Sequence, residues 1–341
     1  MSKHELWELQ QMQAMPLDVK VALTRERIRN WYKGWDGQIY LSFSGGKDST
    51  VLKHIVDDMY DDIPSVFVNT GLEYPEVQRF AMAQKNVITI RPKMGFREVI
   101  TKYGYPIISK EISQKISEAR SAINNGNTGA RAVKHFNGEI QGRYDYSRYK
   151  HLISAPFMIA ADCCYKLKKK PAQQYEKETG RKMMLAMMTE ESYLRQQNWV
   201  LNGCNAFEMK RPRSTPMAFW TEQDVLHYII QNDLKIASVY GEIKLKQTNQ
   251  LQGQINLIDQ IGYEDGDKLQ CTGCQRTGCV FCGFGCHVQK GKNNFQRLKE
   301  THPKQWAYCI GGGEYKDGLW QPNEKGLGMA KVLDFIGVKY E

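Results

Sequence analysis

A run of small, charged and hydroxyl-bearing residues, SGGKDS at positions 44–49, directly follows a short β-prone segment at 39–43. Adjacent glycines let a backbone approach a phosphate closely and adopt conformations closed to other residues. If a helix begins just after them, its first amides supply N–H donors and the positive end of a dipole. Lys47 adds a point charge, the serines add hydroxyl donors, and Asp48 could help hold a Mg²⁺ ion that bridges phosphates. The run therefore predicts a phosphate-binding loop, although it is not a Walker loop, which needs GxxxxGK[ST].

Strand-like and helical segments alternate around this loop, as expected for crossover connections in a parallel sheet. The predicted strands are 39–43, 65–69, 87–90 and 183–188. The predicted helices are 17–33, 49–60, 75–85, 96–103 and 170–179. We therefore predict an α/β fold with a doubly wound, mainly parallel sheet, followed by a small cysteine-rich C-terminal subdomain.

Changes of composition along the chain predict three parts. Residues 1–36 form an N-terminal helical segment, residues 37–235 a nucleotide-binding domain, and residues 236–341 a cysteine-rich region. Within the central part, residues 121–151 are rich in Gly, Asn, Arg and Tyr and show no clear period. This stretch predicts a basic, loop-rich insertion or lid.

The overall composition excludes several classes of protein. Of the 341 residues, 41% are hydrophobic and 25% are charged, which is close to the average for globular proteins and excludes wholesale disorder. There is no run of 18 apolar residues to span a membrane, and the first residues show no apolar signal region. We therefore expect a cytoplasmic protein with no membrane partner. Nine cysteines are then expected to be metal ligands, redox groups or buried thiols rather than disulfides.

The positive charge is concentrated. The formal net charge is +10, and residues 102–182 hold 16 Lys/Arg against 7 Asp/Glu. Such a surplus suggests a polyanionic partner, either a nucleotide or a nucleic acid. Residues 143–151 also interleave cations with aromatic rings, and could grip phosphates and stack bases or form a solvated lid.

Five further segments, taken together with SGGKDS, resemble a known family. They are NTGLEYPE at 69–76, CCYKLK at 163–168, EESYLR at 190–195, a P…WT…DV pattern at 216–225 and RTGCVFC at 276–282. In this order the sequence resembles the PP-loop ATP pyrophosphatases and, among them, the phosphoadenosine phosphosulfate (PAPS) reductase family. The resemblance implies an adenine nucleotide α-hydrolase-like fold and cleavage of ATP between its α- and β-phosphates.

The resemblance also implies the residues of the active site. The implied catalytic residues are Lys47, Asp48 and Arg195. The implied nucleotide-binding residues are Ser44, Gly45, Gly46, Lys47, Asp48, Ser49, Asn69, Thr70, Gly71 and Glu73. The implied cofactor is ATP with Mg²⁺.

The cysteines match one subgroup of that family. In enzymes that reduce adenylyl sulfate, a CC pair and a distant CxxC together hold a [4Fe–4S] cluster, and Cys163, Cys164, Cys279 and Cys282 match this pattern. An alternative is a compact zinc site formed by Cys271, Cys274, Cys279 and Cys282. A third possibility is that no metal is bound. For the isolated Cys204 and Cys309, buried inert thiols are the default interpretation.

Two features differ from the reductases. Reductases with a mobile catalytic cysteine carry it in an ECGLH-like tail, and this sequence has no cysteine after Cys309. Family members that bind a pre-formed adenylyl sulfate often have a degraded phosphate loop, whereas SGGKDS is intact here. Both features favour ATP as the substrate, in the manner of the iron–sulfur enzymes of bacterial DNA phosphorothioation.

Three functions follow from these observations. The leading hypothesis is an enzyme that activates an acceptor as an adenylate, releasing pyrophosphate, for sulfur transfer, with nucleic acid as one candidate acceptor and a cysteine desulfurase as one candidate sulfur donor. The first alternative is an adenylyl sulfate or PAPS reductase that forms sulfite. The second is a nucleotide- or nucleic-acid-binding module with structural zinc. A homo-oligomer is the expected assembly.

Overall fold

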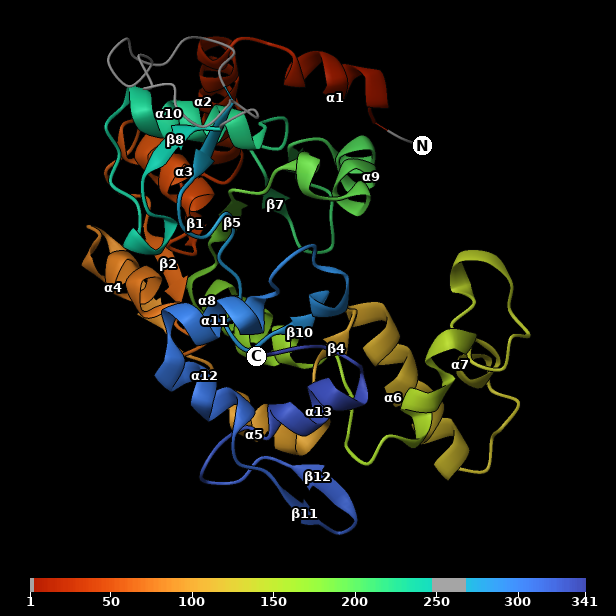
Figure 1. The fold of residues 1–341 in the computed structure, drawn as a ribbon. Helices are drawn as coiled ribbons and strands as arrows, with labels where there is room; N and C mark the ends of the chain where they lie inside the picture. The colour runs from red at the N-terminus through yellow and green to blue at the C-terminus, as the bar shows by residue number, and fades with distance from the viewer. Residues whose placement is uncertain (1–2, 247–267) are drawn as a thin grey trace, which may run out of the picture. The chain divides into compact units, whose positions relative to one another are not determined.

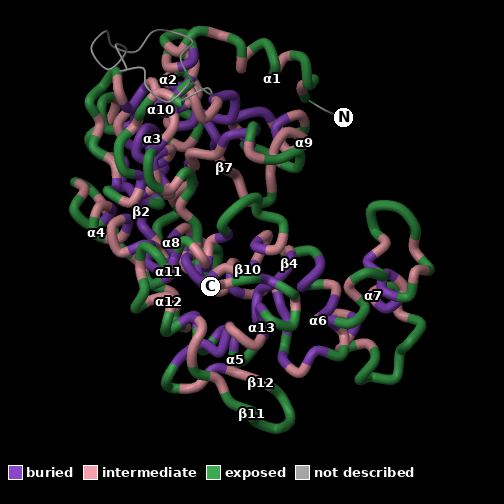
Figure 2. The backbone as a smooth tube through the Cα atoms, in the orientation of Figure 1, coloured by how far each residue is buried: buried purple, intermediate pink, exposed green. Residues whose placement is uncertain are grey.

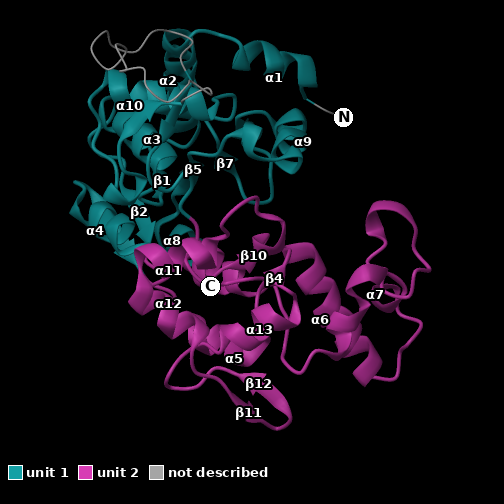
Figure 3. Cartoon of the chain, viewed as in Figure 1, with its two compact units in different colours: residues 1–68, 74–90, 173–277 teal, residues 69–73, 91–172, 278–341 magenta. Residues whose placement is uncertain are grey.

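The computed structural model describes residues 3–246 and 268–341, and the chain divides into two compact units (Figures 1 and 3). Unit 1 comprises residues 1–68, 74–90 and 173–277, and unit 2 comprises residues 69–73, 91–172 and 278–341. The chain thus passes between the units several times. The sequence-based boundaries near residues 36 and 235 remain predictions, and residues 247–267 of the predicted C-terminal region lie outside the described residues.

Unit 1 is built on a six-stranded sheet with the order β3-β2-β1-β5-β7-β6. The strands are β1 (Ile39–Phe43), β2 (Ser65–Val68), β3 (Val87–Ile90), β5 (Lys182–Leu185), β6 (Asn205–Ala206) and β7 (Arg213–Ser214). Every neighbouring pair is parallel except β6 and β7, which are antiparallel. The predicted mainly parallel α/β sheet is therefore confirmed.

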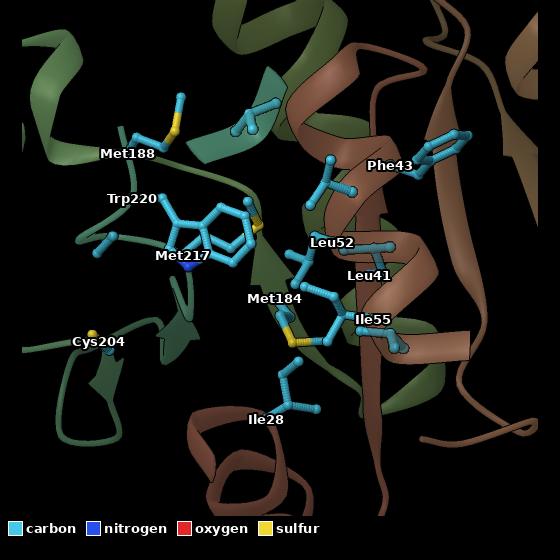
Figure 4. Packing of buried hydrophobic residues seen from close by; sticks show 14 of the residues in the cluster. Ile28, Leu41, Phe43, Leu52, Ile55, Met184, Met188, Cys204, Met217 and Trp220 are labelled. Atoms are coloured by element: carbon cyan, nitrogen blue, oxygen red, sulfur yellow. The ribbon is translucent and has the colours of Figure 1, made fainter. Parts of the chain in front are cut away.

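Both faces of this sheet are buried. Along β1, Ile39, Leu41 and Phe43 belong to a large hydrophobic cluster that also contains side chains of the helices α2 (Leu17–Gly34), α3 (Lys47–Asp57) and α10 (Glu222–Gln231). Figure 4 shows Leu41 and Phe43 of β1 among side chains of this cluster, which include Ile28 of α2 and Leu52 and Ile55 of α3. Tyr40 points to the opposite face, where it packs edge-on against Tyr175 of α8 with 5.1 Å between the ring centroids. Because successive side chains of a strand point to opposite faces, helices on both sides are what the doubly wound prediction requires.

Four helices of this part of the chain coincide closely with predicted ones, a fifth at 6–13 lies within the predicted N-terminal helical segment, and those at 193–202 and 222–231 were not predicted. These helices are α1 (Leu6–Gln13), α2 (Leu17–Gly34), α3 (Lys47–Asp57), α4 (Pro75–Ala83), α8 (Lys170–Thr179), α9 (Tyr193–Asn202) and α10 (Glu222–Gln231). The main difference is α3, which begins at Lys47 rather than at the predicted Ser49. Gly46 is its N-cap, so the lysine and aspartate of SGGKDS lie in the first turn.

Unit 2 is a mixed assembly of short elements. Its helices are α5 (Phe96–Tyr103), α6 (Lys110–Asn124), α7 (Arg131–Lys134), α11 (Asn294–Thr301), α12 (Pro303–Ile310) and α13 (Met329–Phe335). Its strands are β4 (Ile107–Ile108), β10 (Gly283–Phe284), β11 (Glu314–Lys316) and β12 (Leu319–Gln321). The parallel pairing of β4 with β10 joins the middle of the chain to the segment that follows Cys282.

The tube in Figure 2 shows long exposed stretches around α7, within the predicted insertion 121–151.

The described part of this chain contains no helix long and apolar enough to cross a membrane.

Candidate active site

The phosphate loop turns sharply between β1 and α3 in unit 1. Gly45 has φ = +71°, and a Cβ atom there would lie 2.9 Å from both the Val77 carbonyl oxygen and the Ala81 Cβ. A larger residue would therefore suffer both backbone strain and a clash with α4. The glycine is required by the turn itself, as the sequence predicted for a loop that brings its backbone close to a ligand.

Hydroxyl groups fasten the loop to the first turn of α3. Ser44 Oγ lies 2.9 Å from Ser49 Oγ and accepts a hydrogen bond from the Gly46 amide at 3.3 Å. Ser49 Oγ and Thr50 Oγ1 donate to the Gly46 carbonyl oxygen at 2.9 and 3.0 Å. These bonds hold the backbone amides at the start of α3 in a fixed arrangement, which is the basis of anion binding at a helix N-terminus.

Lys47 is 4% exposed, yet its ammonium group has several acceptors. Its Nζ atom lies 3.0 Å from Glu222 Oε1, 3.0 Å from the Gln275 carbonyl oxygen and 3.6 Å from Asp48 Oδ1. Burial acts to lower the pKa of Lys47, but the two carboxylates outweigh it, so that the pKa is raised above its ordinary value. The lysine therefore carries a full positive charge at the loop.

The loop lies where the strand order reverses. β1 is flanked by β2 on one side and by β5 on the other, so the chain leaves the carboxyl ends of β1 and β5 at a topological switch point. The segment after β5 ends in α9, where Arg195 donates to the Met188 carbonyl oxygen at 3.2 Å and forms an ion pair with Glu191.

The charge of Asp48 also affects the Arg195 guanidinium. Burial lowers the pKa of the Arg195 guanidinium, and the carboxylate of Asp48 offsets part of that shift. Glu191 is shared, because it also pairs with Arg276. The implied catalytic residues Lys47, Asp48 and Arg195 therefore all lie in unit 1, where Lys47 pairs with Asp48 and the Asp48 charge acts to raise the pKa of Arg195.

The loop that follows β2 is folded around a carboxylate. Thr70 donates to Glu73 from its backbone amide at 3.0 Å and from its hydroxyl at 2.7 Å. The Gly71 amide donates to Asn69 Oδ1 at 3.1 Å. These four implied nucleotide-binding residues belong to unit 2, whereas residues 44–49 belong to unit 1.

The four cysteines of the CC and CxxC pattern line one cavity in unit 2. The lining residues are Leu72, Phe96, Pro106, Cys163, Cys164, Leu167, Lys168, Cys279 and Cys282. Cys163 and Cys164 lead into a π-helical stretch at Tyr165–Lys169, a wide helical turn of a kind often found at functional sites. The Val280 amide donates to the Leu72 carbonyl oxygen at 2.8 Å, and Lys168 Nζ lies 4.0 Å from Glu73 Oε1.

Three of these thiols are costly to ionise, and one is not. A hydrogen bond to Cys164, together with burial, raises the pKa of Cys163. Burial also raises the pKa of Cys279, and it raises the pKa of Cys282 to about 12. The hydrogen bond from Cys163, with help from Lys110 and Lys168, lowers the pKa of Cys164. Thiolates at such a site need a strong neighbouring positive charge, and a bound metal supplies one.

The donor set of this cavity fits a group held by four thiolates. Its lining combines four thiols with apolar side chains and one lysine, and contains no carboxylate. Residues 3–246 and 268–341 contain no group of three or more His, Cys, Asp or Glu side chains that could hold a metal ion. A cluster of several iron atoms uses one thiolate for each iron, so its ligands need not converge on one point.

The remaining cysteines lie elsewhere. Cys271 and Cys274 of the alternative zinc set belong to unit 1, and burial raises the pKa of Cys271. Cys309 is 0% exposed, and Cys204 accepts a hydrogen bond from the Trp199 indole at 3.3 Å.

The basic insertion presents two arginine–tyrosine pairs. The Arg143 guanidinium lies 4.9 Å from the Tyr144 ring centroid, and that of Arg148 lies 4.6 Å from the Tyr149 ring centroid. Between them Tyr146 points inward, where its hydroxyl donates to Glu111 at 2.6 Å. The stretch is therefore anchored to α6 by one tyrosine while both arginines remain exposed.

Sequence reasoning missed the residues that contact Lys47 from a distance in the chain. Glu222, Gln275 and Tyr240 lie 175 or more positions after Lys47. Glu222 had a weak signal, since it follows the WT of a recognised segment, whereas Tyr240 belongs to none of the recognised segments.

Comparisons with known proteins agree with the recognised segments. Residues 38–137 match the family model described as a phosphoadenosine phosphosulfate reductase domain. The chain is 23% identical to a phosphoadenosine 5'-phosphosulfate reductase of Alkalilimnicola ehrlichii, over 65% of this chain and 72% of that protein. It is 37% identical over 87 residues to an uncharacterised protein of Methanocaldococcus jannaschii, covering 23% of this chain and only 21% of that relative's length.

Solved structures also resemble this chain. A PAPS reductase of Candida auris in a phosphate complex aligns with a TM-score of 0.37 and 14% identity, covering 68% of this chain and 90% of that one. The resemblance to the family is confirmed by the sequence comparisons, while the DNA phosphorothioation branch is not.

Proposed function

Because this chain belongs to the PAPS reductase family of the PP-loop superfamily, we propose that it binds ATP with Mg²⁺ and activates an acceptor as an adenylate for sulfur transfer. The observation that carries the proposal is the complete phosphate loop. Gly45 keeps the tight turn, the hydroxyls order the amides, and Lys47 carries its charge at the loop. A site that binds only adenylyl sulfate has no pyrophosphate to hold and does not need this turn, these ordered amides or the Lys47 charge.

The proposed reaction has two displacements. An acceptor oxygen forms a bond to the α-phosphorus of ATP, the bond from that phosphorus to the bridging oxygen breaks, and pyrophosphate leaves with the bonding electrons. A sulfur nucleophile then forms a bond to the activated atom of the acceptor and displaces AMP. Lys47 and Arg195 stabilise the negative charge that develops on the phosphates in the first displacement.

The cavity in unit 2 is proposed to hold a [4Fe–4S] cluster on Cys163, Cys164, Cys279 and Cys282. Such a cluster would supply a site at which sulfur or electrons are held. The chain's own contribution is the apolar lining, which excludes water, and Lys168, which offsets negative charge at the thiolates. The alternative set Cys271, Cys274, Cys279 and Cys282 with zinc stays an open prediction.

A nucleic-acid acceptor is the proposal that the basic insertion favours. Arg143 and Arg148 can contact phosphates, and the rings of Tyr144 and Tyr149 beside them can stack on bases. The anchoring of Tyr146 to Glu111 favours an ordered surface over a freely moving one. The sulfur could arrive from a cysteine desulfurase or another donor.

A second candidate function is the reduction of PAPS or adenylyl sulfate to sulfite. The name of the Alkalilimnicola ehrlichii relative favours it. The two functions differ in the nucleotide consumed and in the product released.

One experiment separates these functions. The protein is purified anaerobically, its iron and zinc are measured, and pyrophosphate release from ATP is followed with and without DNA or tRNA. α,β-Methylene-ATP, which cannot release pyrophosphate, is the matched control. Iron together with acceptor-stimulated pyrophosphate release is the expected result. Sulfite from adenylyl sulfate, with no pyrophosphate from ATP, would establish the reductase instead, and zinc without turnover of either nucleotide would contradict both enzymes.

A further inference from the structure

A buried tyrosine hydroxyl contacts the phosphate loop of unit 1. Tyr240 ends a short 3₁₀ helix, Ser238–Tyr240, and is 2% exposed. Its Oη atom accepts a hydrogen bond from the Lys47 backbone amide at 3.2 Å and lies 2.7 Å from Thr277 Oγ1. This amide belongs to the first residue of α3, and amides at that position of a helix bind phosphate oxygens.

Three hydroxyls converge beside Gly46. A Cβ atom at that glycine would lie 3.2 Å from Tyr240 Oη, 3.3 Å from Ser44 Oγ and 3.6 Å from Thr277 Oγ1. Each hydroxyl can both donate and accept, so the group can turn its donors toward an anion. Hydroxyls, a helix-terminal amide and the Lys47 ammonium together make up the chemistry of a phosphate site.

The hydroxyl pair is not what holds these segments together. The Gly273 amide donates to the Tyr240 carbonyl oxygen, and the Cys274 amide donates to the Val239 carbonyl oxygen, each at 2.9 Å. A Cβ atom on Gly241 would lie 2.3 Å from Thr272 Oγ1, so the two backbones already pack in close contact. A phenylalanine at position 240 would keep this packing, and the tyrosine hydroxyl therefore needs another explanation.

We propose that Tyr240, assisted by Thr277, is a phosphate-positioning residue of the ATP site. When ATP binds, a phosphate oxygen accepts the hydrogen bond from the Lys47 amide in place of Tyr240 Oη. The phenol hydroxyl of Tyr240 then rotates and donates a hydrogen bond to the same phosphate oxygen. Only hydrogen bonds are exchanged, and the proposal rests on the proposed function, in which this loop binds ATP. Burial raises the pKa of Tyr240, so the phenol keeps its proton at neutral pH and can donate.

The test compares Tyr240→Phe and Thr277→Val with the wild type, using calorimetry with ATP and with AMP. Tyr228→Phe is the matched control, because Tyr228 is a buried tyrosine of the same unit whose hydroxyl lies 2.9 Å from His54 Nδ1. A lost hydrogen bond to a charged group predicts about 10-fold weaker ATP binding for Tyr240→Phe. AMP binding, which does not use the β- and γ-phosphates, is expected to change by less than about 2-fold.

Two further expectations make the assignment specific. Thr277→Val is expected to weaken ATP binding less than Tyr240→Phe, and the double variant less than the sum of both free-energy changes, because the hydroxyls act as a pair. Unchanged or tighter ATP binding by Tyr240→Phe would overturn the proposal, as would an equal loss for ATP and AMP or an equal loss in Tyr228→Phe. Failure of the wild type to bind ATP would instead remove the proposed function on which the inference rests.

Discussion

The phosphate loop and the four-cysteine cavity are built in opposite ways. The loop is six consecutive residues whose polar atoms bind one another and the first turn of α3. The cavity combines segments that include residues 72, 163–168 and 279–282, and most of its thiols have raised pKa values. The polar groups of the loop are ordered by local hydrogen bonds, whereas three of the four cavity thiols, all except Cys164, are costly to ionise without a neighbouring positive charge.

The difference also concerns what each site can tolerate. A turn set by φ = +71° at Gly45 depends on the local backbone and on α4 beside it. The cavity depends on the meeting of distant segments, so the proposed metal would stabilise unit 2 by linking them. Changes in the loop should therefore abolish pyrophosphate release and leave the metal content unchanged, whereas changes in the cavity should remove the proposed metal and leave ATP binding unchanged.

The largest expected effect is that of Lys47→Ala. If Lys47 stabilises the phosphates as proposed, removal of this buried charge predicts a fall in pyrophosphate release of about 10²–10³-fold. Iron content and the visible spectrum should stay unchanged, because all cavity residues lie in unit 2. Lys53→Ala is the control on the same helix, since Lys53 pairs with Asp57 at 2.8 Å instead. A loss of iron in Lys47→Ala would end the separation of the two sites.

The next effect concerns the combined Cys279→Ala and Cys282→Ala change. It should abolish the visible absorption and lower the Tm by about 3 °C for each kcal/mol that the bound group contributes. The ATP dissociation constant should stay within about 2-fold of the wild type, which is the scale of a neutral substitution. Cys286→Ala is the control, because Cys286 is also buried and lies four residues after Cys282, but does not line the cavity. Retained iron in the double variant would refute the assigned ligands.

Much of the fold could be predicted because its signals are local. The apolar run at 39–43 and the helical pattern at 96–103 became β1 and α5 with the same bounds. The start of α3 was placed two residues too late, because the periodic apolar residues begin at Val51 and the N-cap is a glycine. The pairs β6–β7 and β4–β10 were not predicted, since two-residue strands have no readable period.

The residues of the candidate site likewise fall into those with a local sequence signal and those brought together only by packing. The residues of SGGKDS could be predicted because a phosphate loop needs fixed residue types at consecutive positions. The partners of Lys47 could not, because Glu222 and Gln275 reach it only through the packing of α10 and of the segment after β9 (Leu269–Cys271). No rule of spacing connects residues so far apart in the chain.

The smallest expected effect is that of Glu222→Gln, which changes the charge around Lys47 and keeps the side-chain size. Burial acts to lower the pKa of Lys47, while Asp48 and Glu222 raise it, so removal of the Glu222 charge must shift that pKa downward. In the proposed function, turnover needs the charged lysine and is therefore lost as the pH rises through the pKa of Lys47. The ordinary value is about 10.4, so the wild-type kcat/KM should stay level up to about pH 10, and that of the variant should begin to fall at a lower pH.

At pH 7.5 the lysine is charged in both proteins, and their kcat/KM values should agree within about 3-fold, since less than 1 kcal/mol then separates them. Glu190→Gln is the control, because Glu190 accepts a hydrogen bond from the Glu222 amide at 2.7 Å and forms no ion pair with Lys47. The same shift of the fall in activity to lower pH in Glu190→Gln would mean that the general charge of the site, rather than the Lys47–Glu222 pair, sets the pH limit. No shift in Glu222→Gln would show that the charge of Lys47 does not depend on the Lys47–Glu222 pair. The phosphate loop and the four-cysteine cavity would then differ less in their electrostatics than their geometry indicates.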